Sequence, residues 1–181
     1  MYSKRIFRLS LITFFMNIAY SSILYDFHTD SNLRGWSVVD DVVMGGRSSG
    51  NLSLTKDGHG LFNGYISLRN YGGFSSVRCR TKVSNARNYE YIAIKVYGDN
   101  KYYQLRIRSN NTDNHVYVKK FFAENKWNVI KIPLISMEPQ FRGRKLWMNN
   151  FNGNTITEVG ILVGNKVEED FSLLIDYIIL D

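Results

Sequence analysis

The sequence predicts an all-β fold, specifically a jelly-roll β-sandwich. Aromatic residues are abundant, with 12 Tyr and 11 Phe among 181 residues, whereas alanine occurs only at Ala19, Ala86, Ala93 and Ala123. Aromatic side chains suit pleated strands and alanine is the best helix former, so a helix bundle is disfavoured. With 44% hydrophobic and 22% charged residues, the composition is that of an ordinary globular protein and excludes a disordered or fibrous chain.

Period-two alternation bounded by Gly, Asn and Asp supplies the second observation, because it is typical of half-buried antiparallel strands. The clearest strands are predicted over residues 91–97, 103–108, 116–119, 127–133 and 171–180. At least eight such runs in one sheet would leave an apolar face in water, so two packed sheets are predicted. Residues 135–150 are predicted to form a loop.

The alternation also assigns side chains to faces. Tyr103, Leu105 and Ile107 are predicted to face the core, opposite Arg106 and Arg108. In the last strand the predicted core side chains are Phe171, Leu173, Ile175, Tyr177 and Ile179. Tyrosines predicted on polar faces, where they could meet a partner, are Tyr91, Tyr97 and Tyr117.

The first 21 residues have the pattern of a signal peptide, which leaves residues 22–181 as one predicted domain. A basic start (Lys4, Arg5, Arg8) precedes a compact apolar run over residues 9–18, and small residues suit cleavage after Ser21. The predicted location is the periplasm or cell surface. A mitochondrial presequence, or a buried first strand or helix of a cytoplasmic protein, remains open. The run is too short for a permanent membrane anchor, which needs about 20 apolar residues.

The net charge of +7 belongs partly to this leader. Cleavage after Ser21 removes three basic residues and no acid, which leaves 20 basic and 16 acidic residues, a net charge of +4. The basic residues form no stripe in the sequence, so no nucleic-acid partner is predicted.

Signatures of catalysis and of metal or cofactor binding are missing from the sequence. It contains no GxGxxG after a strand, P-loop, HExxH, GxSxG or Cys/His metal spacing, and its three histidines are far apart. We therefore predict no catalytic residue, metal or cofactor. The single Cys79 lies between two arginines, which could lower its thiol pKa, but a buried residue on the inward face of a strand is the stronger interpretation.

Two segments are unusually rich in glycine and polar residues. The first holds Asp40, Asp41, Met44, Gly45, Gly46 and Ser48. Paired glycines indicate a tight turn or a close approach of two backbones. Alternation would point the adjacent acids to opposite faces, so they are a poor acid–base pair. We expect one carboxylate to cap the Gly-Gly turn or to pair with an arginine such as Arg78.

The second segment repeats the glycine pair, at Gly72, Gly73, Phe74, Ser75 and Arg78. Alternation places Arg78 on the polar face of its strand, and Arg106 and Arg108 on the polar face of a later strand. If these strands share a sheet, they form a basic face that could bind a sugar, a phosphate or an acidic protein patch. The oligomeric state is not predicted.

VVDDVVMGGRSSG (38–50) followed by FNGYISLRNYGGFSSVR (62–78) resembles the complex I intermediate-associated protein family, the domain of the assembly factor for NADH:ubiquinone oxidoreductase. The resemblance continues through Gly98-Asp99, Trp127 and residues 139–144, and it closes with residues 159–162 and 171–176. It implies a galactose-binding-domain-like sandwich with a non-enzymatic, chaperone-like role in assembling a membrane complex. Trp36 and Arg142 join the candidate residues on this basis.

The sequence supports two functional hypotheses. The first is a protein-binding, chaperone-like assembly factor whose partner is a membrane-complex intermediate. The alternative is an exported module that binds a carbohydrate or another small ligand through its Arg- and Tyr-bearing strand faces. An enzyme using Asp40 or Asp41 with Arg78 is the least supported hypothesis.

Overall fold

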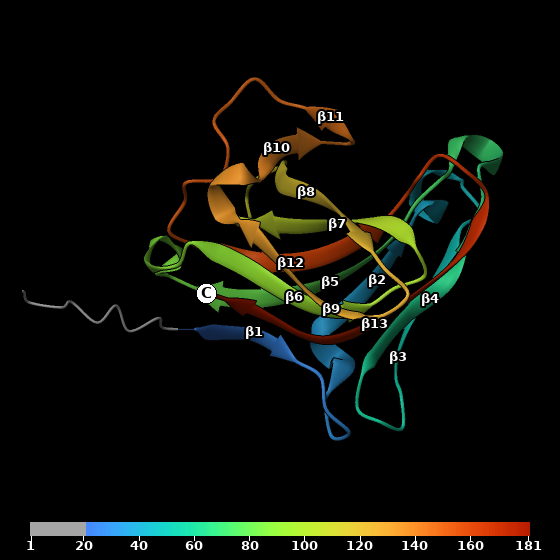
Figure 1. Cartoon of the computed structure of the whole chain (residues 1–181). Helices are drawn as coiled ribbons and strands as arrows, with labels where there is room; N and C mark the ends of the chain where they lie inside the picture. The colour runs from blue at the N-terminus through green and yellow to red at the C-terminus, as the bar shows by residue number, and fades with distance from the viewer. Residues whose placement is uncertain (1–20) are drawn as a thin grey trace, which may run out of the picture.

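A computed structural model describes residues 21–181 of the chain. These residues form two antiparallel sheets that pack face to face (Figure 1). The six-stranded sheet contains β1 (Ser22–Asp26), β3 (Ser49–Leu54), β4 (Gly60–Ile66), β6 (Tyr91–Tyr97), β9 (Trp127–Pro133) and β13 (Glu169–Leu180). The seven-stranded sheet contains β2 (Trp36–Asp40), β5 (Ser75–Val83), β7 (Lys101–Arg108), β8 (Val116–Ala123), β10 (Glu138–Phe141), β11 (Arg144–Lys145) and β12 (Ile156–Val163).

The strand order differs strongly from the sequence order. The six-stranded sheet runs β3-β4-β13-β6-β9, with β1 also paired to β13, and the seven-stranded sheet runs β11-β10-β8-β7-β12-β5-β2. The helical elements within residues 21–181 are all short 3-10 helices: η1 (Leu33–Gly35), η2 (Asp41–Met44), η3 (Arg69–Tyr71), η4 (Ala86–Asn88) and η5 (Leu134–Ser136). The predicted all-β jelly-roll sandwich is confirmed.

The core lies between the sheets and follows the predicted alternation in most strands. Tyr103, Leu105 and Ile107 of β7 are buried, while Arg106 and Arg108 point to the other face. Cys79 of β5 is also buried, and burial raises the pKa of its thiol. The inward-facing position predicted for this cysteine is confirmed, and the thiol is not activated by its arginine neighbours.

Strand β8 departs from the prediction, because Tyr117 faces the core. It pairs with Ile107 of β7, and directly paired residues of antiparallel strands share a face. Its ring meets that of Phe151 edge to face at a centroid distance of 5.2 Å. Val118 lies on the outer face, paired with Arg106. Both faces of β8 carry apolar residues, so alternation over residues 116–119 could not choose between them.

Strand β13 contains a β-bulge that reverses the predicted faces after Ile175. Ile175 pairs with Val96 and Tyr177 with the preceding Lys95, so two steps on β13 match one on β6. Ile178 and Leu180 consequently point into the core, and both are fully buried. The predicted core positions of Tyr177 and Ile179 are therefore wrong.

Residues 135–150, predicted as a loop, contain the β10–β11 hairpin. Phe141 pairs with Arg144, which leaves Arg142 and Gly143 as a two-residue turn. Both turn residues have positive φ (48° and 76°), as a type I′ hairpin turn requires. Figure 1 shows this hairpin projecting at the edge of the seven-stranded sheet.

The predicted leader lies outside the described residues except for Ser21. Strand β1 begins at Ser22, which pairs with Leu180, so cleavage after Ser21 would leave β1 intact. Within residues 21–181, no helix has the length and apolar character needed to cross a membrane.

Candidate functional site

Three neighbouring strands of the seven-stranded sheet bring the predicted arginines together. Gly160 of β12 pairs with Arg78 of β5 on one side and with Arg106 of β7 on the other. The two arginine Cα atoms are therefore roughly 10 Å apart, twice the strand spacing. Because the residue between them has no side chain, the two guanidinium groups border an open floor. The basic sheet face predicted from alternation is confirmed.

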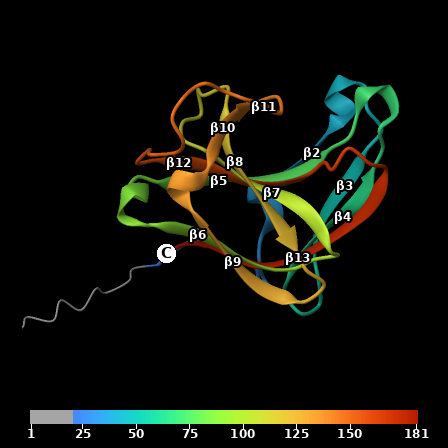
Figure 2. The same ribbon diagram turned by 45° about the horizontal axis from the view of Figure 1, so that its top comes forward.

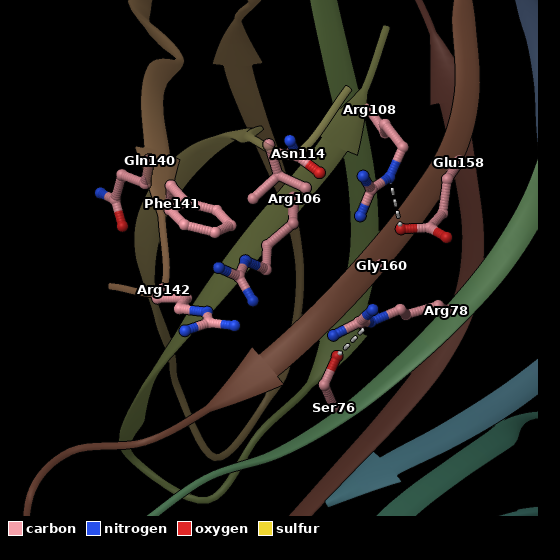
Figure 3. A pocket seen from close by; sticks show the side chains of 11 residues that line it. Ser76, Arg78, Arg106, Arg108, Asn114, Gln140, Phe141, Arg142, Glu158 and Gly160 are labelled. Carbon is pink, nitrogen blue, oxygen red and sulfur yellow. Dashed lines mark hydrogen bonds and ion pairs between the residues drawn. The ribbon is translucent and has the colours of Figure 1, made fainter. Parts of the chain in front are cut away.

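The next row of the sheet and the β10–β11 hairpin complete this site. Glu158 of β12 pairs with Arg108 of β7, and the turn of the hairpin adds Arg142. Together with Ser76, Asn114, Gln140 and Phe141, these residues line a pocket of about 210 Å³. Figure 3 shows the guanidinium groups of all four arginines gathered over this part of the sheet.

A second pocket, of about 470 Å³, adjoins the first along the sheet. The two pockets share Arg106, Gln140 and Arg142 as lining residues. One wall of the second pocket comes from residues 72–74 after η3, the opposite wall from the hairpin, and Leu162 contributes to the floor. In Figure 2 the β10–β11 hairpin and the green η3 turn both rise above the seven-stranded sheet and stand apart from each other. We call the two connected pockets the arginine groove.

Charge in the arginine groove is unbalanced. Arg108 Nε lies 3.5 Å from Glu158 Oε1, and its Nη1 donates to the carbonyl of Asp113. Arg78 Nε donates to Ser76 Oγ at 3.5 Å. Four arginines thus share one carboxylate among the residues that line the first pocket.

Arg106 differs from Arg78 and Arg108 in that its Nε has no hydrogen-bond partner within the described part of the chain. The same Nε is buried. Burial, with the charges of Arg78 and Arg108 added, lowers the pKa of Arg106 to about 10. The group therefore stays protonated at neutral pH, as an unpaired cation beside an open pocket.

Asp41 lies outside this groove and fastens the two loops that carry the glycine pairs. Its side chain is fully buried and accepts four hydrogen bonds: from the N–H and hydroxyl of Ser48 and from the N–H groups of Gly73 and Phe74. Burial alone would raise the pKa of Asp41, but the hydrogen bonds from these residues outweigh it and lower the pKa below its ordinary value. The carboxylate is thus held as an anion.

Each glycine pair has one residue that needs left-handed backbone and one that packs against Asp41. Gly45 and Gly73 have φ of +89° and +131°. A Cβ on Gly46 or Gly72 would come within 2.2 Å or 2.5 Å of a carboxylate oxygen of Asp41. The predicted tight turn and close approach are both present. Asp41 is the carboxylate that caps the glycine turns. It does not pair with Arg78, which lines the groove instead.

A family model for complex I intermediate-associated protein 30 matches residues 25–175 of the chain. The chain belongs to this family. Comparison with curated protein sequences gives no match.

The solved structures most similar to this complex I intermediate-associated family member include carbohydrate-binding modules. A family 11 module from Clostridium thermocellum, in complex with a β-1,3-1,4-mixed-linked tetrasaccharide, has a TM-score of 0.66 at 15% identity, over 88% of this chain and 94% of the module. A family 30 module has a TM-score of 0.55 at 12% identity, over 90% of this chain and 99% of the module. The agarase AgWH50C matches with a TM-score of 0.58 at 13% identity, over 89% of this chain and 24% of the enzyme. These likenesses show the fold alone.

Some of the family-motif residues are buried or bonded within the fold, and others line the arginine groove. Trp36 is buried against Tyr25 and Phe27, and Asp40 accepts a hydrogen bond from Gly50 N–H at 3.1 Å. Ser75 is fully buried. The motif residues that line the groove are Gly72, Gly73, Phe74, Arg78, Arg106, Arg108 and Arg142. Met44 lies in η2, and its side chain is outside the described part of the structure.

Sequence reasoning missed the uncharged residues that shape the groove. Gly160 gives space for the arginines: a Cβ there would lie 2.8 Å from the Val77 carbonyl oxygen and 3.3 Å from Arg78 Cγ. Gln140 and Asn114 supply amide groups from β10 and from the β7–β8 connection. The available signal for Gly160 was a glycine inside an apolar strand run, which indicates a close approach of another group.

Proposed function

We propose that this chain is a non-catalytic binding module that holds an acidic glycan in the arginine groove. The observation that supports this most directly is Arg106, with its buried and unpartnered Nε and two further arginines beside it. Burying a charge is costly unless it is paired and hydrogen-bonded. A carboxylate or sulfate on a ligand in the pocket would supply a counter-charge for this guanidinium, and the planar arginine fork suits such groups.

The other lining residues support a sugar as the carrier of that acid. Asn114 and Gln140 offer amide groups that match the donors and acceptors of sugar hydroxyls. Phe141 adds an exposed ring at the mouth of the groove. The similarity in fold to carbohydrate-binding modules agrees with this proposal, while the excess of arginine favours an acidic ligand over a neutral one.

Calorimetric titration with oligogalacturonate, and with a neutral β-glucan tetrasaccharide for comparison, tests the proposal. We expect the native chain to prefer the acidic ligand. Arg106→Gln should weaken binding by about 30-fold or more, because removing one partner of a buried charge pair costs about 2 kcal/mol or more. Arg80→Gln is the matched control, since Arg80 lies on β5, two residues beyond Arg78, and lines neither pocket. Equal affinity for neutral and acidic ligands, or none for either, would overturn the proposal.

Export is part of the same proposal, because glycans of this kind are met outside the cytoplasm. The basic and apolar leader supports it. N-terminal sequencing of the protein from its native host should give Ser22 as the first residue. A protein that still begins at Met1 would instead favour a cytoplasmic location.

The second candidate is the chaperone-like assembly role, which the family match over residues 25–175 favours. In that case an acidic segment of a membrane-complex intermediate would occupy the arginines. Crosslinking in native membranes followed by mass spectrometry should then recover subunits of NADH:ubiquinone oxidoreductase with the native chain and with Arg80→Gln, but far less with Arg106→Gln. Recovery that does not depend on Arg106 would exclude the groove as the binding site for this partner.

A further inference from the structure

The outer face of the seven-stranded sheet continues past the arginine groove to an aromatic pair. Side chains two residues apart on a strand share a face, so Tyr102 and Gln104 of β7 lie on the same face as Arg106. Tyr102 pairs with Phe122 of β8, and Gln104 pairs with Lys120. The aromatic pair thus stands on the same surface as the groove, four residues from Arg106 along one strand.

Both rings of this pair are exposed, although large apolar side chains are usually buried. Tyr102 is 49% exposed and Phe122 is 42% exposed. The two rings meet edge to face with centroids 5.1 Å apart, so they form one fixed unit. Lys120 Nζ lies over one face of the Tyr102 ring, 4.2 Å from its centre, in a cation–π contact.

The space between the aromatic pair and Arg106 is lined by groove residues. Gln104 and Leu162, which pair with each other across β7 and β12, both line the second pocket. Lys166 joins the same lining, and the neighbouring Asn165 donates to the carbonyl of Tyr102 at 3.0 Å. The surface therefore runs from Arg106 through Gln104 to Tyr102, a span of roughly 13 Å at about 3.3 Å per strand residue.

We propose that the arginine groove and the Tyr102–Phe122 pair form one extended site for an acidic oligosaccharide. This rests on the proposed function and adds a requirement for chain length. An acidic group of the ligand pairs with Arg106 over Gly160, and a sugar ring further along the same oligosaccharide packs against the exposed Tyr102–Phe122 pair. Lys120 and Lys166 lie beside that part of the chain, where a repeating acidic polymer presents another negative charge.

The dependence of affinity on the length of the oligosaccharide distinguishes the extended site from the arginine groove alone. A monosaccharide cannot reach both Arg106 and Tyr102, whereas a longer oligomer can, and linking two contacts raises the overall affinity. In calorimetric titration we expect galacturonate monomer to bind weakly and the hexamer to bind at least about tenfold more tightly. Tyr102→Ala should remove most of this gain and leave monomer binding unchanged, whereas Arg106→Gln should weaken binding at every length.

Tyr65→Ala is the matched control, because Tyr65 is an exposed tyrosine on β4 of the other sheet. It should leave the dependence on chain length intact. An affinity that does not rise with length, or a rise that survives both Tyr102→Ala and Phe122→Ala, would overturn the extended site while the arginine groove stands. Absence of binding at every length would overturn both proposals. Binding of poly-glutamate, but not of oligogalacturonate, would assign the site to an acidic protein segment instead.

Discussion

Arg78 and Arg106 lie on opposite sides of strand β12 and are both in register with the same residue, Gly160. Two like charges would normally be separated or paired, and here the residue between them offers no side chain. This arrangement is unfavourable for the free protein and favourable for an anionic ligand.

Asp41→Asn should lower the free energy of unfolding by about 2–4 kcal/mol, because the amide nitrogen that replaces one carboxylate oxygen cannot accept a hydrogen bond and leaves at least one buried donor unpaired. Urea denaturation measures the change. Asp40→Asn is the control, since Asp40 accepts a hydrogen bond from Gly50 N–H alone in the described structure. A loss no larger for Asp41 than for Asp40 would contradict the fastening role.

The pH dependence of stability should contain a contribution from Asp41. Its pKa is lower in the folded protein than in the unfolded chain, so its stabilising effect is complete above the unfolded value of about 3.9 and is lost as the pH falls through the folded value. Denaturation curves of the native chain and of Asp41→Asn should therefore differ by a constant amount above about pH 5 and converge in stronger acid. A difference that grows on acidification would show the opposite sign and exclude this explanation.

Gly143→Ala should lower the free energy of unfolding by about 1 kcal/mol, because a side chain disfavours the left-handed backbone of the hairpin turn. It should also weaken ligand binding, since the turn positions Arg142 in the groove. Gly35→Ala is the control, because Gly35 has ordinary φ and a Cβ there would meet only Cys79 Sγ at 3.6 Å. Equal effects of the two substitutions would mean that the turn conformation contributes nothing.

The sequence predicts the sheets better than the site. Alternation identifies Arg78, Arg106 and Arg108 as outward-facing because strand period is a local property. It fails at Tyr117, where both faces are apolar, and after Asp176, where one inserted residue reverses the faces of β13. The hairpin at Arg142 and Gly143 was missed because its strands are short and its turn lacks the usual Asn-Gly or Asp-Gly signal.

The assembly of the groove depends on strand order, which a single sequence does not encode locally. Arg78 and Arg106 become neighbours only because β12 inserts between β5 and β7, and β12 begins 48 residues after the end of β7. Gly160 lies between the two arginines only because of that insertion. The role of Asp41 could be partly foreseen, because the glycine pair that follows Asp40 and Asp41 in the sequence indicated a tight turn or a close approach.

We infer that Arg106 serves to bind an anionic ligand at a cost to the stability of the free protein. The most direct test is the free energy of unfolding of the native chain and of Arg106→Met, each measured with and without oligogalacturonate. Without ligand, we expect the variant to be more stable by about 1–2 kcal/mol, because it removes an unpaired cation and keeps the apolar stem. With ligand at a hundredfold excess over Kd, the native chain should gain about 2.7 kcal/mol and the variant almost nothing, which reverses the order. A variant that is less stable without ligand, or that gains as much from ligand as the native chain, would contradict the account.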